Sequence, residues 1–303
     1  MTVRFVRPVS QSAYAARRIG LSALVLFLMA LGVHRFGLLT GPDFVAVVLF
    51  SAAIAAVAIL FALVGLTRLW QAGAQGGVAS AKALIYAAPP VILVAVAAIL
   101  YVETPALYDV STDTADPPVW ISEPRADQQW LQRPATVTPS DRQLQLTAYP
   151  ELTGRRYEGA VDRVYEAVQK VATSARISLE RKHGMELVEP DITERPAPKS
   201  RVETGAVPDV IPIPLPRPEP QRPGKPAVVI GRPGDVILQG ETKTLILGLR
   251  FDVVIRLREE AETTTVDMRV ASRYGAHDLG LSDAIAEDFL RALDSELLGL
   301  AVD

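Results

Sequence analysis

The stretch FVAVVLFSAAIAAVAILFALVGL, from Phe44 to Leu66, contains no charged residue and decides the architecture of the N-terminal part of this 303-residue chain. A helix needs about 20 consecutive apolar residues to cross the roughly 30 Å hydrocarbon layer of a bilayer. Two further apolar stretches flank it, Ile19 to Leu39 and Ala83 to Val102. Because no A-x-A cleavage site ends the first stretch, a retained helix is favoured over a cleaved signal peptide. We therefore predict three transmembrane helices within residues 19–102.

The positions of the basic residues predict how these helices are oriented. Lys and Arg are enriched in the cytoplasmic loops of membrane proteins. Four arginines precede the first stretch, and Arg68 and Lys82 border the loop between the second and the third. After the third stretch, five acids come before the first basic residue, Arg125. We expect a membrane protein in which residues 1–18 form a cytoplasmic tail and the C-terminal part lies outside the cytoplasm.

The composition excludes some classes of partner. The chain has no cysteine, so it forms neither disulfides nor cysteine-based metal sites, and it tolerates an oxidising compartment. Its net charge is -3 and its isoelectric point is near 5.8. No concentrated basic face occurs in the sequence, whereas binding to a phosphate backbone depends on one. We expect the lipid bilayer as a partner and no nucleic acid.

Two polar passages are predicted to lack regular structure. Residues 103–141 contain prolines and no sustained helical or strand period, which is typical of a linker that holds the next domain away from the bilayer. Residues 190–226 are dense in proline, and the run from Ile211 to Pro220 favours an extended polyproline II rod. A semi-rigid solvated loop is the favoured interpretation of this insertion, and a ligand for an aromatic groove is the alternative.

Residues 142–303 are predicted to form an α+β domain. Leu144, Leu146 and Ala148 alternate with polar residues as in a half-buried strand, and the apolar residues between 161 and 172 recur at helical spacing. Two short alternations around His183-Gly184 indicate a turn between strands. Further strands are expected at Val228 to Ile230, Val236 to Gln239, Thr242 to Leu247, Leu249 to Arg258 and Thr263 to Ser272, and a last helix from Ser282 to Leu298. The predicted fold is a two-layer α+β domain with two helices on one face of an antiparallel sheet.

The last two predicted strands carry the charged residues of most interest. Period-two alternation turns Asp252 and Arg256 of the first strand to the outer face of the sheet. Asp267, Arg269 and Arg273 of the second strand share that face. One interpretation is a surface whose arginines hold a carboxylate or phosphate through paired hydrogen bonds. A ladder of cross-strand ion pairs on a solvated face is the other, and on chemistry alone it is favoured.

Two sets of motifs in the chain resemble a known family. Phe251-Asp-Val-Val-Ile-Arg256, Val266-Asp-Met-Arg269, Ala271-Ser-Arg-Tyr-Gly275 and Asp278-Leu-Gly280 are similar to the C-terminal signature of the bacterial domain-of-unknown-function family numbered 1499. Asp109-Val-Ser-Thr-Asp-Thr-Ala-Asp-Pro-Pro118 resembles the segment that opens the domain in that family. The resemblance covers residues 109 to about 298. It implies a compact domain, often behind membrane helices, and no established reaction, substrate or cofactor. Because the family is bacterial, the resemblance together with the expected orientation implies the bacterial inner membrane, with the domain in the periplasm.

The sequence offers no catalytic or metal-binding pattern. Of the three histidines only His277 lies near charged residues, and with Ser272 and Asp278 it suggests a hydrolase. No G-x-S-x-G nucleophile elbow accompanies them, so a polar loop is the favoured interpretation. No zincin, calcium-loop or phosphate-loop motif occurs, and the acids between residues 109 and 116 are interpreted as solvating a linker in preference to a weak cation site. We expect no metal and no cofactor.

The expected function is therefore that of a non-enzymatic membrane protein whose periplasmic domain binds an envelope protein or a small anionic ligand, in envelope maintenance. The candidate surface is made of charged and hydroxyl side chains, namely Asp252, Arg256, Asp267, Arg269, Ser272, Arg273 and Asp278. One alternative is an envelope enzyme that acts on an anionic substrate, which a deep pocket around these groups would favour. Another is an accessory subunit of a membrane complex, because the small residues between Ser51 and Ala58 offer a close helix-packing face.

Overall fold

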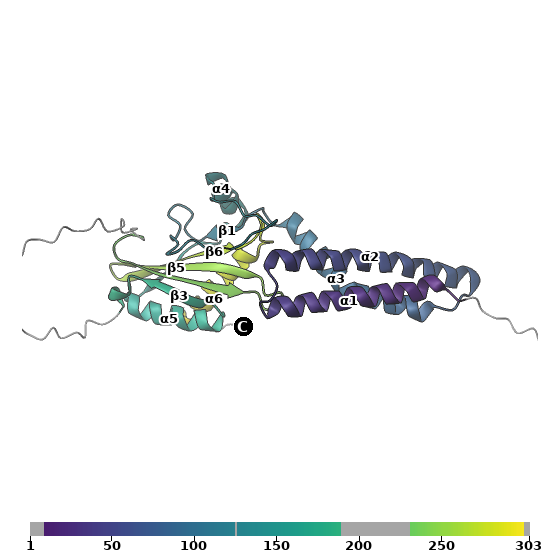
Figure 1. Cartoon of the computed structure of the whole chain (residues 1–303). Helices are drawn as coiled ribbons and strands as arrows, with labels where there is room; N and C mark the ends of the chain where they lie inside the picture. Colours follow the sequence, from purple (N-terminus) through teal and green to yellow (C-terminus); the bar gives the residue numbers. More distant parts are fainter. Residues whose placement is uncertain (1–8, 125, 189–230, 300–303) are drawn as a thin grey trace, which may run out of the picture.

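The computed structural model describes residues 9–124, 126–188 and 231–299 (Figure 1). Three long helices form a bundle at one end of the molecule: α1 (Gln11–Arg35), α2 (Gly41–Ala72) and α3 (Gly77–Glu103). Each is long and apolar enough to cross a membrane, so the prediction of three such helices is confirmed. The proline-rich insertion at 190–226 and the strand expected at 228–230 lie outside the described residues.

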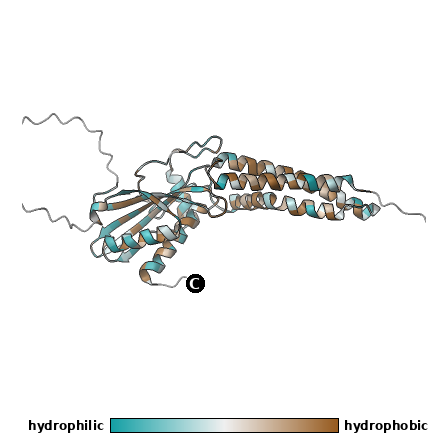
Figure 2. Cartoon of the chain, turned by 60° about the horizontal axis from the view of Figure 1, so that its bottom comes forward, coloured by the Kyte–Doolittle hydropathy of each residue, from teal (hydrophilic) through white to brown (hydrophobic). Residues whose placement is uncertain are grey.

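Small side chains bring the three helices of the bundle together. Ala23, Ala55 and Ala87, one from each helix, form a buried cluster. Ser51 and Ala58 of α2 are also fully buried. The close-packing face expected between residues 51 and 58 is thus used within this chain. Large apolar side chains point outward instead, and the bundle is predominantly hydrophobic over its length (Figure 2), as is typical of helices that face lipid.

The C-terminal domain is built on a six-stranded antiparallel sheet. Its strands are β1 (Asp109–Ser111), β2 (Arg155–Glu158), β3 (Ser178–His183), β4 (Asp235–Lys243), β5 (Arg250–Glu260) and β6 (Thr263–Ser272). The order is β1-β6-β5-β4-β3, and β2 pairs with β6 on the same edge as β1. Two helices, α5 (Val161–Ser174) and α6 (Leu281–Leu298), cover one face (Figure 1). The predicted antiparallel sheet with two helices on one face is confirmed.

Alternation along β5 and β6 decides which side chains enter the core. Val253 and Ile255 of β5, and Met268 of β6, are fully buried in the cluster under α5 and α6. Burial of one such side chain contributes about 1.5–3 kcal/mol. The register places Arg256 directly opposite Asp267. Their side chains therefore share the outer face, the face that α5 and α6 leave uncovered, as predicted.

The prediction of a strand at Leu144, Leu146 and Ala148 was wrong, because these residues lie in helix α4 (Pro139–Ala148). The side chain of Thr138 accepts a hydrogen bond from the backbone of Asp141, and the Asp141 carboxylate accepts one in return from the backbone of Thr138. This capping box fixes the first helical turn. Three alternating apolar residues are too few to outweigh it, and two of them, Leu144 and Leu146, are exposed.

Two further strand predictions were wrong at their ends. Residues 244–247, expected in a strand from Thr242 to Leu247, and Leu249, expected to begin the next strand, lie in the turn between β4 and β5. Residues after Gly184 form a short 3-10 helix, η1 (Met185–Leu187), in place of a second strand. Both sites contain a glycine with positive φ, Gly248 at 70° and Gly184 at 76°, a conformation that ends a strand.

The passage from 103 to 141 is not an unstructured linker throughout. β1 pairs with β6, and the residues after it cross the outer face of the sheet to β4. We call residues 112–124 the strap. At its far end the backbone of Ser122 donates to the side-chain oxygen of Gln239 at 3.0 Å and accepts from the Gln239 amide at 2.7 Å. The strap is therefore part of the folded domain.

The domain lies directly against one end of the bundle (Figure 1). The ring of His277 stacks on Tyr101 near the end of α3 with 4.5 Å between centroids, and its Nε2 lies 3.1 Å from the backbone oxygen of Thr104. Leu249 packs against the apolar cluster that includes Phe44 of α2. These contacts correct the expectation of a spacer that holds the domain away from the membrane helices.

Candidate functional site

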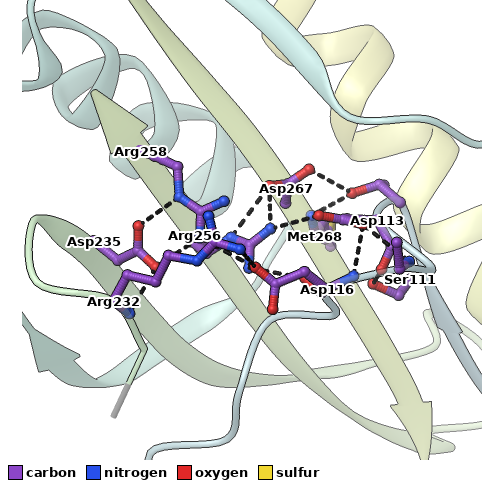
Figure 3. A network of polar contacts seen from close by, with 11 residues as sticks. Ser111, Asp113, Asp116, Arg232, Asp235, Arg256, Arg258, Asp267 and Met268 are labelled. Carbon is purple, nitrogen blue, oxygen red and sulfur yellow. Dashed lines mark hydrogen bonds and ion pairs between the residues drawn. The ribbon is translucent and has the colours of Figure 1, made fainter. Parts of the chain in front are cut away.

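Charged side chains occupy the outer face of the sheet, and the strap closes over them (Figure 3). Arg256 lies among them with its side chain only 3% exposed. Its guanidinium is 2.6 Å from the Asp267 carboxylate on the neighbouring strand and 3.0 Å from that of Asp113 in the strap. It also donates to the backbone oxygen of Asp116 at 2.8 Å. Arg256 thus joins the strap to the sheet.

Arg258 forms a second ion pair on this face. Its Nε and Nη2 donate to the two oxygens of Asp235 at 2.8 and 2.9 Å. Burial by itself raises the pKa of Asp235, but hydrogen bonds from Arg258 and from the backbone of Arg232, with the charges of Arg258 and Arg256, outweigh it and lower the pKa below its usual value. The Asp235 carboxylate therefore stays ionised.

Arg273 holds two acids beyond the end of β6. Its guanidinium is 2.6 Å from the Asp252 carboxylate and 2.7 Å from that of Glu241. The hydrogen bond from Arg273 to Asp252 raises the pKa of Arg273 further above its usual value. Burial raises the pKa of Glu241, but the charge and hydrogen bond of Arg273 reverse that effect, so its pKa is lowered. The Arg273 guanidinium and the carboxylates of Asp252 and Glu241 therefore neutralise one another's charge.

Asp109 connects the sheet to α4. Its side chain is 4% exposed, and its two oxygens lie 2.8 Å from Arg142 and 2.8 Å from Arg269. The guanidinium carbon of Arg269 lies 4.9 Å from the ring centroid of Trp120 in the strap. A cation over an indole ring in this range is attracted by the electrons of the ring. The Asp109 carboxylate therefore connects the sheet to α4 through Arg142 and, through Arg269, to Trp120 of the strap.

A cleft of about 810 Å³ lies beside this junction, within the size range of ligand pockets. Arg133, Arg142 and Arg269 all line it, together with the acids Asp109 and Glu123. Asp109 neutralises part of the charge of Arg142 and Arg269. No carboxylate lies within ion-pairing distance of Arg133 in the part of the chain that the structure describes.

Contacts to the protein leave part of the Arg133 guanidinium available. It lies over the ring of Tyr108, with 5.6 Å between the guanidinium carbon and the ring centroid. Its Nη1 donates to the backbone oxygen of Ser272 at 2.9 Å. Burial, and then the charge of Asp109, raises the pKa of Tyr108, so the Tyr108 hydroxyl stays protonated. Arg133 is the cation of the cleft that is best placed for an added anion.

The structure divides the residues of the predicted surface among three places. Those held in ion pairs on the outer face are Asp252, Arg256, Asp267 and Arg273. Arg269 lines the cleft. Ser272 donates to the backbone oxygen of Tyr274 at 2.9 Å, and Asp278 accepts from the backbone of Gly280 and Ser282 where α6 begins. The ion pairs favoured from the sequence are present, and the strap contacts three residues of the predicted surface, Arg256, Asp267 and Arg269.

The hydrolase arrangement suggested by His277, Ser272 and Asp278 is not assembled. The Nδ1 atom of His277 accepts from the backbone of Leu279 at 2.9 Å, and its Nε2 faces the end of α3. Neither ring nitrogen contacts Ser272 or Asp278. Over residues 9–124, 126–188 and 231–299, no cluster of three or more His, Asp or Glu side chains is placed to hold a metal ion.

The residues of the cleft that the sequence did not reveal are Trp120, Arg133 and Arg142. The first two lie in the passage interpreted as a linker, and Arg142 begins the predicted domain, just before the predicted strand that is in fact α4. The sequence nevertheless contained a recognisable motif close to each of these two segments. Asp109 to Pro118 carried the family resemblance, and Thr138 to Asp141 is a capping sequence.

Comparison with known proteins agrees with this division of the chain. A family model described as "Protein of unknown function (DUF1499)" matches residues 109–293. The match starts at the first residue of β1, so it includes the strap, the cleft and the sheet and excludes the three-helix bundle. No curated protein matches the chain, and no solved structure matches it.

Proposed function

This chain belongs to the DUF1499 family, whose description names no activity, and we propose from the geometry of the cleft that it is a membrane-anchored protein that binds a small anionic ligand. The observation that carries the proposal is the convergence of three guanidinium groups, those of Arg133, Arg142 and Arg269, on one cleft of about 810 Å³. Guanidinium groups bind carboxylate and phosphate through paired, charge-assisted hydrogen bonds.

The walls of the cleft indicate what else the ligand carries. Trp120 lies beside Arg269, and Val119 and Leu146 are 44% and 48% exposed where they line the cleft. Apolar side chains that stay exposed in a cleft are covered favourably by an apolar or planar part of a ligand. The proposed ligand is a carboxylate or phosphate compound with such a part.

The chemistry of the lining supports binding over catalysis. An envelope enzyme that acts on an anionic substrate needs a base or a nucleophile near the reacting atom. Among the described lining residues the titratable groups besides arginine are Asp109, Glu123 and Tyr108, and no histidine or serine is present. Asp109 is held by two arginines, and Tyr108 holds its proton tightly. The enzyme alternative therefore has less support.

We place the three helices in the bacterial inner membrane, with the N-terminus in the cytoplasm and the domain in the periplasm. The backbone of Ser10 donates to that of Gln75 at 2.9 Å, so the start of α1 lies beside the loop between α2 and α3. Arg17, Arg68 and Lys82 lie toward this end, which is remote from the domain. Basic residues at one end of a bundle favour the cytoplasmic side. A role in envelope maintenance fits this location.

The experiment that tests binding compares anions on the full-length protein in detergent by titration calorimetry. We expect phenyl phosphate to bind more tightly than inorganic phosphate, and neutral phenyl glucoside not to bind. Arg133→Gln removes a charged donor worth about 1.5–3 kcal/mol, so phenyl phosphate should bind roughly 10-fold to 100-fold more weakly. Arg163→Gln, on the exposed surface of α5, is the control and should bind normally. Equal affinity of both variants, or no binding of either anion to the wild type, would contradict the proposal.

A further inference from the structure

The turn between β4 and β5 carries apolar side chains that the domain leaves uncovered. Leu245 and Ile246 at its tip are 65% and 73% exposed. Leu247 and Leu249 on either side of Gly248 pack against the apolar cluster at the domain end of α1 and α2. The tip of the turn therefore lies beside the helices that are long enough to cross a membrane.

The loop between α1 and α2 exposes two more large apolar side chains in the same region. Phe36 is 83% exposed and Leu38 is 82% exposed. The loop and the turn adjoin, since Phe36 and Gly248 line one small cavity of about 100 Å³. Single exposed apolar residues are common on soluble surfaces, but four in one region mark a contact surface.

Basic side chains surround this apolar group. Arg35, Lys243 and Arg250 line the same small cavity. Lys243 and Arg250 are 41% and 38% exposed, and they lie 3.6 and 4.0 Å from Glu241, whose carboxylate is bound more closely by Arg273 at 2.7 Å. Because their ion pairs with Glu241 are long and their side chains are exposed, the ammonium group of Lys243 and the guanidinium group of Arg250 can also meet further anions.

We propose that the turn at residues 244–249 is an interfacial anchor, in which Leu245 and Ile246 enter the outer layer of a phospholipid bilayer while Lys243 and Arg250 face the lipid phosphates. The inference rests on the proposed membrane location of the three helices. Segments that lie in a bilayer interface combine apolar side chains at their tip with basic side chains around them. The turn has this composition and stands where the bundle enters the domain.

A tryptophan near the same end supports lipid as the occupant of this surface. Trp130 is 52% exposed, and the side chain of its neighbour Gln129 lies 3.5 Å from the Thr40 hydroxyl at the start of α2. Tryptophan is enriched at the boundary between membrane and water, where the ring is buried and the N–H stays hydrated. The anchor, together with the end of α3, holds the domain and its cleft in one orientation above the bilayer.

The absence of cysteine from the chain allows a direct test with single introduced cysteines. Full-length Ile246→Cys carrying an environment-sensitive fluorophore is inserted into phosphatidylcholine and phosphatidylglycerol vesicles, with and without a lipid that bears a nitroxide quencher on its acyl chain. Glu262→Cys, beyond the far end of β5, is the water-exposed control. Val57→Cys, 44% exposed on α2, is the membrane control.

We expect the quencher to reduce fluorescence at position 246 at least about twofold, close to its effect at position 57, and to leave position 262 unchanged. Quenching at position 57 without quenching at position 246 overturns the anchor alone. A blue shift at position 246 without quenching also overturns it and indicates a protein partner on the turn. Absence of quenching at all three positions overturns the proposed membrane location instead.

Discussion

At the residue scale, Arg256 holds the domain together through charge. A buried guanidinium is tolerated only when carboxylates and hydrogen bonds replace its lost hydration. Asp267 on the sheet and Asp113 and Asp116 in the strap supply them. The ion pair of Arg156 and Glu260 on the same sheet differs from the buried pair of Arg256 and Asp267, because both of its side chains are exposed and solvated by water.

Replacement of Arg256 by glutamine is expected to lower the free energy of unfolding by about 3–5 kcal/mol, because the Asp267 carboxylate is left buried without its cation. Arg156→Gln is the matched control and should cost less than about 1 kcal/mol. Urea unfolding of the full-length protein in detergent, followed by tryptophan fluorescence, measures both. An equal loss of unfolding free energy in the two variants would show that the buried ion pair contributes no more to stability than the exposed one.

Asp283 gives the domain a dependence on pH. Burial first, and then the charges of Glu287 and Asp278, raises its pKa to about 6. Its pKa in the unfolded chain is about 3.9, so the folded protein holds this proton more tightly. The resulting stabilisation is complete below about pH 4 and is lost as the pH rises through about 6.

Asp283→Asn should therefore gain stability relative to the wild type between about pH 4 and pH 7, by about 1–2 kcal/mol once solvent screening is taken into account. Asp288→Asn is the control on the same helix, because its side chain is 76% exposed. Thermal unfolding of the three proteins across this pH range measures the difference. A difference in stability between Asp283→Asn and the wild type that does not change with pH would refute the raised pKa of Asp283.

At the scale of elements, the strap has little backbone pairing with the sheet: the backbone of Thr112 donates to that of Met268 at 2.9 Å. Beyond β1 it is attached chiefly through side chains, with Asp113 and Asp116 on Arg256 and with Ser122 on Gln239. Segments of this kind open locally while the sheet beneath them stays folded. Since Val119 and Trp120 of the strap line the cleft, ligand binding depends on its position.

The double variant Asp113→Asn with Asp116→Asn weakens charge-assisted bonds to Arg256 and leaves Asp267 in place. We expect backbone amides of residues 112–124 to exchange with deuterium at least about 10-fold faster, while β5 and β6 keep their protection. Glu123→Gln, an exposed residue of the same strap, is the control. Hydrogen exchange read by mass spectrometry measures each segment, and faster exchange in β5 as well would mean that the pairs hold the whole sheet.

At the scale of the whole molecule, the domain lies at one end of the bundle, and Arg17, Arg68 and Lys82 lie toward the other end. A reporter after Glu123 would interrupt the strap, so the C-terminus after Asp303 is the better fusion point for testing topology. Alkaline phosphatase fused there should be active, and a fluorescent protein that matures only in the cytoplasm should be dark. The same reporters in the loop at Gln75 should behave in the opposite way. A fluorescent C-terminal fusion would place the domain in the cytoplasm.

Elements with a long, strong pattern were predicted correctly from the sequence. The three bundle helices follow from apolar length, α5 and α6 from helical spacing, and β5 and β6 from alternation with their charged residues outward. α4 was missed, because Leu144 and Leu146 remain exposed and its buried residue is Gln145, so it has no apolar face to detect. The capping sequence that begins at Thr138 was better evidence for this helix than its apolar residues.

Features that depend on neighbours along the chain could be predicted before the structure was known: the bundle, the sheet with its two covering helices, and the face on which Asp252, Arg256 and Asp267 lie. Three features follow only from the folded chain: the strap lies over Arg256 and Asp267, Asp109 joins Arg142 to Arg269, and the domain rests on the bundle. The hydrogen bonds of these features join residues from 33 to 176 positions apart. No local periodicity encodes such contacts, because their energy arises only when burial makes each charge require a partner.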